Sequence, residues 1–136
     1  MNDRYLFRAK RIDNREWIVG DLSHHKTGKV FVKPLNGSAI STCEVDKDTI
    51  CQCTGLKDKN GKLIWENDVV EIGEHQDNVN GLYKVIYCEN SHCYALKRSV
   101  DFHYNFFTFS DLNGFETSSK VIGNIFDNPE LLESEE

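Results

Sequence analysis

The segment TGLKDKNGKLIWENDVVEI, Thr54–Ile72, decides the fold because it carries the strongest turn signal in the chain. Its Asn60-Gly61 pair accepts the positive φ values of a type I′ turn, whose twist matches the strands that it joins. Beyond the turn, side chains alternate between the two faces of a strand, which directs Trp65 toward an interior. We therefore expect a β-hairpin, and we assign fold-defining roles to Asp58, Asn60, Gly61, Trp65, Asn67 and Asp68.

Chemical interpretations of the same segment are weaker. A calcium loop with Gly61 at its sixth position would place Leu56 first and Asn67 twelfth, where oxygen-rich ligands are required. An acid–base cluster would instead be formed by Asp58, Glu66 and Asp68. All three fall at predicted turns, however, where Asp and Asn side chains bond to their own backbone. The segment thus predicts folding rather than catalysis, and we expect no enzymatic activity.

Most of the remaining chain shows the two-residue periodicity of half-buried strands. The pattern predicts hairpins around residues 13–14 and 36–38, and later strands over residues 82–87, 94–97, 100–109 and 120–126. Strands at this spacing indicate a mainly β fold with little helix, in the form of a small barrel or roll. We divide the chain into an N-terminal β-hairpin region with a basic arm, residues 1–48, and a β-barrel domain, residues 49–136, that ends in a short helical turn and an acidic tail.

The composition is that of an ordinary globular domain. Of the 136 residues, 39% are hydrophobic and 28% are charged, which is enough to bury a core. No run approaches the roughly 20 apolar residues of a membrane-spanning helix, and the start MNDRYLFRAKR lacks the apolar core of a signal peptide. We therefore expect a soluble cytoplasmic protein. The five cysteines, an odd count, indicate reduced thiols rather than a disulfide framework.

Charge is unevenly distributed along the chain. Residues 1–34 hold eight Lys/Arg and four Asp/Glu, a net charge of +4, and the whole chain carries −6, so residues 35–136 carry −10. The overall charge disfavours nonspecific duplex binding, which depends on neutralising phosphates. The basic arm consists of Arg4, Arg8, Lys10, Arg11 and Arg15. It either folds back to neutralise its own acidic body or projects as an interaction surface.

Three stretches carry a family resemblance: the opening FRAKRIDNREWIVGDL, the central TGLKDKNGKLIWENDVV and the closing VIGNIFDNPELL. Together they resemble the YopX-like family of phage and prophage proteins from Gram-positive bacteria. One departure is Asn67, where the family usually has Gly before an Asp. Asn is the best non-Gly residue for a left-handed backbone, so we expect the turn to persist. The resemblance implies an SH3-like barrel in the C-terminal half and a location in a bacterial host cell, and it transfers no biochemical activity.

The cysteines offer one alternative chemistry. Cys51 and Cys53 would share one face of a strand, and Cys88 and Cys93 flank a short loop, so four thiolates could converge on zinc. Their spacings depart from those of structural zinc sites, and buried thiols that act as small hydrophobes are the simpler interpretation. We therefore expect no metal and no cofactor. A nucleophilic pair of Cys93 with a histidine stays open.

A dense aromatic run consists of Phe102, Tyr104, Phe106, Phe107 and Phe109. Small barrels that bind single-stranded nucleic acid stack bases on such strands. Here Asp101 and Asp111 flank the run and no Lys or Arg lies within it, so the positive groove that accompanies base stacking is missing. We interpret the run as a core or subunit-facing stripe.

Three hypotheses about function remain. The first is a non-catalytic accessory protein of a phage or prophage, a β module that binds a phage or host protein or associates with itself as a homo-oligomer. The second is a nucleic-acid-binding barrel whose basic arm grips phosphate, which the net charge disfavours. The third is an acidic body that mimics DNA and occupies the site of a basic host protein. None of them involves a membrane.

Overall fold

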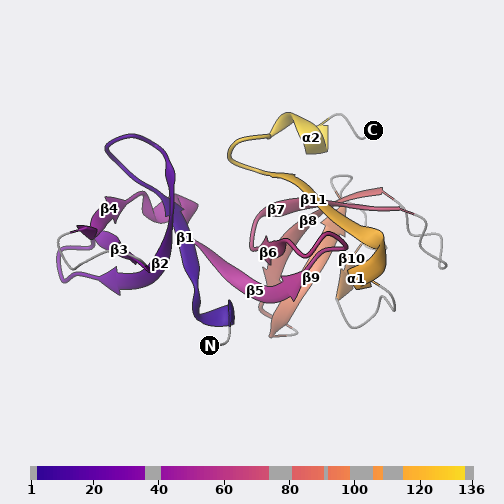
Figure 1. Ribbon diagram of the computed structural model, residues 1–136, viewed down its shortest axis with the longest axis horizontal. Coiled ribbons are helices and arrows are strands. Elements are labelled where there is room, and N and C mark those ends of the chain that lie inside the picture. Colours follow the sequence, from indigo (N-terminus) through magenta and orange to yellow (C-terminus); the bar gives the residue numbers. More distant parts are fainter. Residues whose placement is uncertain are drawn as a thin grey trace. The chain divides into compact units, whose positions relative to one another are not determined.

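The computed structural model describes residues 3–35, 41–73, 81–90, 92–98, 106–108 and 115–133. The chain forms two compact units, Met1–Cys53 and Thr54–Glu136, whose strands are labelled in Figure 1. The division falls between Cys53 and Thr54, whereas the sequence pattern places it between residues 48 and 49. Both units consist mainly of antiparallel strands.

The first unit is an antiparallel meander. It begins with the 3₁₀ helix η1 (Asp3–Tyr5) and continues through β1 (Phe7–Lys10), β2 (Trp17–His24), β3 (Val30–Pro34) and β4 (Cys43–Val45). A second 3₁₀ helix, η3 (Lys47–Thr49), leads into β5 (Cys51–Lys57), which pairs with β1 and continues into the second unit. There it is followed by β6 (Leu63–Trp65), and the sheet has the order β4-β3-β2-β1-β5-β6.

Alternation along β1 and β2 gives this sheet an apolar face. Ala9 pairs with Ile18 across the two strands, and both belong to the core of the unit. The buried members of this core are Ala9, Val30, Val32 and Val45, with Ile18, Leu22 and Ile50 packed against them. Because successive side chains point to opposite faces, the residues between these positions lie on the other face of the sheet.

The second unit contains a five-stranded antiparallel sheet with the order β10-β9-β8-β7-β11. Its strands are β7 (Asp68–Ile72), β8 (Gly81–Cys88), β9 (Cys93–Arg98), β10 (Phe106–Thr108) and β11 (Ser119–Asn124). Figure 1 shows β11, in orange, beside β7, with which it pairs. Two one-turn helices complete the unit, α1 (Phe115–Ser118) and α2 (Glu130–Glu133).

The core of the second unit lies on one face of this sheet. Its buried members are Ile64, Val70, Ile72, Tyr83, Val85, Leu96 and Val121. Trp65 is buried as the alternation predicts, but its neighbour Ile64 is the residue that joins this core cluster. Adjacent strand residues point to opposite faces, so the end of β6 is covered on both sides.

The turn between β5 and β6 differs from the predicted type I′ geometry. Of the two central residues only Gly61 has a positive φ, 79°. The Gly61 N–H donates to Asp58 O at 3.0 Å and the Asp58 N–H donates to Lys62 O at 2.9 Å, as in a type I turn followed by a left-handed glycine. The Asp58 side chain explains the difference, because its Oδ1 accepts the N–H groups of Asn60 and Lys62, each at 2.9 Å, and thereby fixes the type I path.

Asn67 adopts the left-handed backbone expected of it, with φ of 71°. Its N–H donates to Val85 O at 2.8 Å, and its carbonyl accepts the N–H of Ile125 at 3.0 Å. The neighbouring Asp68, 1% exposed, closes the turn by accepting the Trp65 N–H on Oδ2 at 2.8 Å. The turn therefore persists with Asn in place of Gly.

Replacing Asn67 by Ala should destabilise the second unit more than replacing it by Gly. Both substitutions remove the carboxamide of Asn67, and only Ala keeps a Cβ atom, so their difference reflects the cost of a left-handed backbone for a residue with a Cβ atom, about 1–2 kcal/mol. We expect the free energy of unfolding of Asn67→Ala in urea titrations to lie about 1 kcal/mol below that of Asn67→Gly. Equal values would contradict this account of the turn.

The predicted fold class, mainly β with little helix, is confirmed. An isolated bridge between Arg11 and Val45 links the end of β1 to β4, but among the described strands no continuous ladder closes either sheet. The SH3-like barrel therefore stays a prediction. Helix α2 begins at Glu130, directly after Pro129, where the C-terminal helical turn is predicted. Across the described residues, none of the helices has the length and apolar character needed to cross a membrane.

Candidate binding surface

Asp58 uses its carboxylate to hold backbone groups. Besides the two N–H groups of its own turn, its Oδ2 accepts the N–H of Val121, 63 residues away, at 2.9 Å. The residue is only 5% exposed. Burial raises the pKa of Asp58, but the hydrogen bonds from Val121, Lys62 and Asn60 together lower it by more, so its pKa lies below the ordinary value. This carboxylate serves the fold.

The lowered pKa of Asp58 predicts a loss of stability in acid. A group whose pKa is lower in the folded state contributes stability above its unfolded pKa, about 3.9 for Asp, and that contribution is lost as pH falls through the folded pKa. In Asp58→Asn the side chain does not titrate. We therefore expect the difference in free energy of unfolding between wild type and Asp58→Asn to narrow as pH falls below about 4. A constant difference across this range, measured by urea titration, would contradict the prediction.

The closing stretch VIGNIFDNPELL is held by contacts of the same kind. Asn124 Oδ1 accepts the N–H groups of Phe126 at 3.0 Å and Asp127 at 2.9 Å. The two bonds Val121 N–H to Asp58 Oδ2 and Ile125 N–H to the carbonyl of Asn67 join this stretch to the central one. The side chain of Asp58 and the backbone of Asn67 therefore fasten the central stretch to the closing one, and the side chain of Asn124 holds the turn within the closing stretch.

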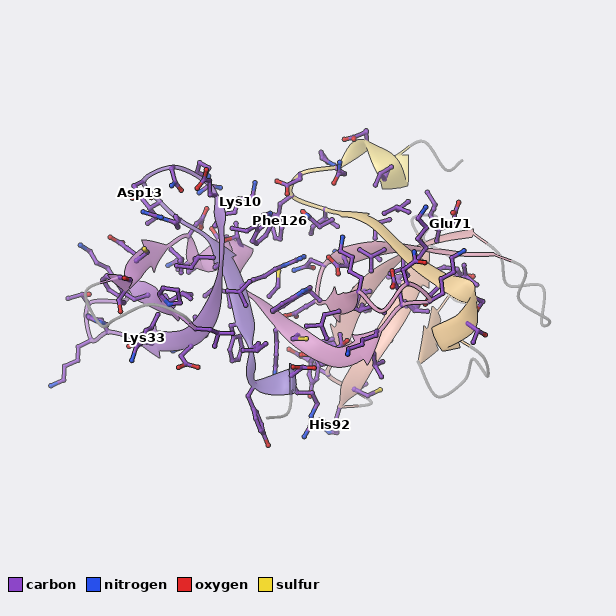
Figure 2. The ribbon with its side chains drawn as sticks, in the orientation of Figure 1. Lys10, Asp13, Lys33, Glu71, His92 and Phe126 are labelled. Atoms are coloured by element: carbon purple, nitrogen blue, oxygen red, sulfur yellow. The ribbon has the colours of Figure 1, made fainter. Side chains whose placement is uncertain are left out.

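Basic and aromatic side chains of β1 and β2 lie on the face of the first sheet opposite its core. The register sets Arg8 opposite Val19 and Lys10 opposite Trp17. The guanidinium carbon of Arg8 lies 4.7 Å from the centroid of the Trp17 ring, and Lys10 Nζ lies 5.3 Å from it. Lys10 is labelled near the end of β1 in Figure 2. Two cations thus flank one half-buried indole, an arrangement in which the ring quadrupole attracts both.

Arg4 and Tyr5, in η1, form a further contact between a cation and an aromatic ring near the N-terminus. The Arg4 guanidinium carbon lies 5.8 Å from the centroid of the Tyr5 ring, and Tyr5 is 62% exposed. Gln52 Nε2 donates to the carbonyl of Arg4 at 2.7 Å, which ties η1 to β5. We define the basic aromatic surface as Arg4, Tyr5, Arg8, Lys10 and Trp17.

The two other arginines of the predicted arm, Arg11 and Arg15, form ion pairs within the first unit. In the loop after β1, where Figure 2 labels Asp13, Arg11 bonds to Asp13 through Nε to Oδ1 at 3.0 Å and Nη2 to Oδ2 at 2.7 Å. The hydrogen bond from Arg11 lowers the pKa of Asp13. Arg15 Nη1 donates to Asp46 Oδ2 at 3.0 Å, and the pKa of Asp46 is lowered by the N–H of Asp48 and then by Arg15. Of the five predicted cations, Arg4, Arg8 and Lys10 therefore contact aromatic rings, and Arg11 and Arg15 form the ion pairs described above.

The cysteines divide into two pairs. Cys51 and Cys53 are fully buried in β5, and Cys51 Sγ donates to Thr49 O at 3.2 Å. Cys88 and Cys93 are half-buried and lie opposite each other in β8 and β9. In the parts of the chain that the structure describes, no three His, Cys, Asp or Glu side chains are grouped so that they could hold a metal ion.

Part of the aromatic run lies outside the described residues, namely Phe102, Tyr104 and Phe109. Phe106 and Phe107 belong to β10, where they pair with Lys97 and Leu96 of β9. The proposed core or subunit-facing role of the run stays a prediction.

Tyr5 and Trp17 are the members of the surface that sequence reasoning missed. The signal for Trp17 was available, because a hairpin centred on Asp13-Asn14 sets Lys10 opposite Trp17. Tyr5 carries no comparable signal, since its ring contact with Arg4 depends on the 3₁₀ turn that precedes β1.

The fold and this surface define a two-unit, mainly β protein that presents stacked cations and aromatic rings on its first unit. The chain belongs to the YopX protein family, whose model matches residues 6–133, so the resemblance is confirmed. Among solved structures it is similar to the crystal structure of protein EF1440 from Enterococcus faecalis, with 24% identity, a TM-score of 0.53 and coverage of 93% of this chain and 96% of that chain. This likeness shows the fold alone. No curated protein matches the chain.

Proposed function

We propose that this protein is a non-enzymatic binding module that engages an acidic protein surface through its basic aromatic surface. The observation that carries the proposal is the pair of cations on one indole, with the Arg8 guanidinium carbon 4.7 Å and Lys10 Nζ 5.3 Å from the Trp17 centroid. Tyr, Trp and Arg are the residues that most often dominate the energy of protein interfaces. Stacking also holds the side chains in place before a partner arrives, which reduces the entropy lost on binding.

The charges of the two units support an acidic partner, including a second copy of this chain. Residues 1–53 hold nine Lys/Arg and seven Asp/Glu, a net charge of +2, whereas residues 54–136 hold seven and fifteen, a net charge of −8. Complementary potentials of this kind steer association and fix its orientation. The first unit of one copy and the second unit of another therefore carry opposite net charges, and a homo-oligomer is the first case to test.

Two double variants separate the surface from net charge. Arg8→Gln/Lys10→Gln and Arg11→Gln/Arg15→Gln each remove two positive charges, but only the first pair flanks Trp17. In sedimentation velocity at low salt, we expect wild type and the Arg11/Arg15 variant to associate and the Arg8/Lys10 variant to remain monomeric. Equal loss in both variants would mean that only net charge matters, and it would contradict the proposed surface.

If the wild type is monomeric, the same two double variants are compared for binding to another protein. A photoreactive residue at the exposed Tyr5 would then capture proteins in the bacterial host, with Tyr87, 43% exposed, as the matched position in the second unit. The proposal expects a product at position 5 that the Arg8/Lys10 variant loses and the Arg11/Arg15 variant keeps. Capture at position 87 alone would contradict it.

Single-stranded nucleic acid is the second candidate partner, because stacked cations and aromatic rings also bind bases and phosphates. Titration of a labelled single-stranded oligonucleotide at increasing salt distinguishes a nucleic-acid partner from an acidic protein partner. The logarithm of the affinity could fall linearly with the logarithm of salt concentration, and only the Arg8/Lys10 substitutions could weaken the binding. This result would favour nucleic acid over a protein as the partner. Absence of binding at low salt would remove this candidate.

The absence of catalysis and a role in a phage or prophage are parts of the same proposal. Support comes from the family assignment and from the engagement of Asp58 and Asp68 with backbone N–H groups. A cytoplasmic site of action in the bacterial host is proposed with them. Turnover of a small substrate that a single substitution abolishes would refute the non-enzymatic part.

A further inference from the structure

Cys88 and Cys93 face each other at the end of the β8–β9 hairpin. They form the terminal pair of the register, directly opposite across two antiparallel strands. The preceding pair, Tyr87 and Tyr94, has ring centroids 5.3 Å apart, so side chains at this end of the hairpin meet across the strands. Figure 2 labels His92, which lies in the connecting turn next to Cys93 in the sequence.

The spacing of opposed residues suits a disulfide. In antiparallel strands, directly opposed Cα atoms lie about 5.5 Å apart in hydrogen-bonded pairs and about 4.5 Å apart in the others. A disulfide requires a Cα separation of about 4.4–6.8 Å, so either type of pair meets the requirement without opening the ladder. Neither cysteine forms a disulfide in the structure, and both residues are half-buried rather than fully buried.

We propose that Cys88 and Cys93 form a dithiol site that reacts with low-molecular-weight disulfides and closes a disulfide within the hairpin. The site lies in the second unit, and the basic aromatic surface lies in the first. The inference is therefore independent of the proposed binding function, and either can fail without the other.

The reaction balances without a metal or cofactor. One protein thiolate attacks a sulfur atom of the small disulfide RSSR, which forms a mixed protein–S–SR disulfide and releases RS⁻. The opposite thiolate then attacks the protein sulfur, which forms the Cys88–Cys93 bond and releases a second RS⁻. The two protein thiols lose two protons and two electrons, and RSSR gains them as two RSH. Because the second thiol is held opposite the first, the closing step is intramolecular and fast.

The other cysteines lack this arrangement. Cys51 and Cys53 are two positions apart on one strand, where side chains on the same face are separated by about 6.6 Å, beyond the Cβ separation that a disulfide allows. Both are fully buried. Cys43 is half-buried, and its Sγ donates to the carbonyl of Ser41 at 3.1 Å. Cys43 therefore serves as the control thiol.

Peptide mapping of the full chain tests the site. The native protein is incubated with oxidised glutathione, denatured, alkylated and digested with trypsin, which leaves both thiols on the peptide Val85–Lys97. We expect this peptide to escape alkylation and to lose the mass of two hydrogen atoms. Further cleavage after Glu89 should give two fragments that separate only after reduction. A lasting glutathione adduct on the peptide, two alkylated thiols or a disulfide-linked dimer would each overturn the proposal.

Matched variants show which thiols take part. In Cys88→Ser the ring cannot close, so we expect a glutathione adduct to accumulate on Cys93. In Cys43→Ser we expect the same internal disulfide as in wild type. Loss of the disulfide in Cys43→Ser, with the fold intact by circular dichroism, would contradict the assignment. The wild-type map is decisive even if a variant fails to fold.

Discussion

Asp58→Ala is expected to lower the free energy of unfolding of the second unit by about 3 kcal/mol, because hydrogen bonds to a charged group contribute about 1.5–3 kcal/mol each and are not fully additive. The substitution removes the acceptor of three backbone N–H groups, those of Asn60, Lys62 and Val121. The N–H of Val121 is in a buried bond, so the loss leaves a buried donor without its acceptor. Urea titration followed by fluorescence measures the effect in a Trp17→Phe background, where Trp65 is the remaining tryptophan.

Glu89→Ala is the control for Asp58→Ala. Glu89 is an exposed carboxylate in the turn between β8 and β9 of the same unit, so its loss should change the free energy of unfolding by less than about 0.5 kcal/mol. Similar effects of the two substitutions would mean that the bonds of Asp58 do not stabilise the unit.

Gly20→Ala is the second large effect, expected to destabilise the first unit by about 3 kcal/mol, at the upper end of overpacking costs. A Cβ atom at Gly20 would overlap the carbonyl oxygen of Lys33 and lie 2.8 Å from its carbonyl carbon. Gly20 pairs with Pro34 in the β2–β3 ladder, so the clash involves backbone that moves only if the strands separate. Thermal unfolding followed by the circular dichroism of the sheet measures the loss.

Gly73→Ala provides the contrast in the other unit. A Cβ atom there meets no described atom within 4 Å, and the φ of Gly73 lies outside the left-handed region. We expect Gly73→Ala to be neutral or slightly stabilising because Ala reduces the freedom of the unfolded chain. If Gly20→Ala were as mild as Gly73→Ala, the close approach of β2 and β3 would be wrong.

The sequence predicts elements whose signals are local. The Asp58–Lys62 turn, the Asn67 turn and the strands that later form β8, β9 and β11 follow from turn residues and two-residue periodicity. The predicted type I′ turn is wrong because the prediction considers only the turn propensity of Asn60-Gly61. In the folded chain Asp58 accepts the N–H groups of its own turn and that of Val121, a contact between segments that local rules do not relate.

The candidate surface is predicted only in part for the same reason. Arg8 and Lys10 are identified as members of a basic arm, but their separation from Arg11 and Arg15 depends on where the chain reverses. Arg15 forms an ion pair with Asp46, 31 residues later, and the composition of the arm does not indicate that pairing. Net charge along a sequence therefore does not show which cations form ion pairs within the folded chain.

The most direct test of the binding surface is hydroxyl-radical footprinting of the associated protein. Tyr5, 62% exposed, and the half-buried Trp17 report on the surface, while Tyr87, 43% exposed, and Trp65, 8% exposed, are references in the second unit. We expect Tyr5 and Trp17 to lose labelling on association with a second copy or with a captured partner, and Trp65 to stay weakly labelled throughout. Unchanged labelling of Tyr5 and Trp17 in a complex that protects other residues would contradict this expectation.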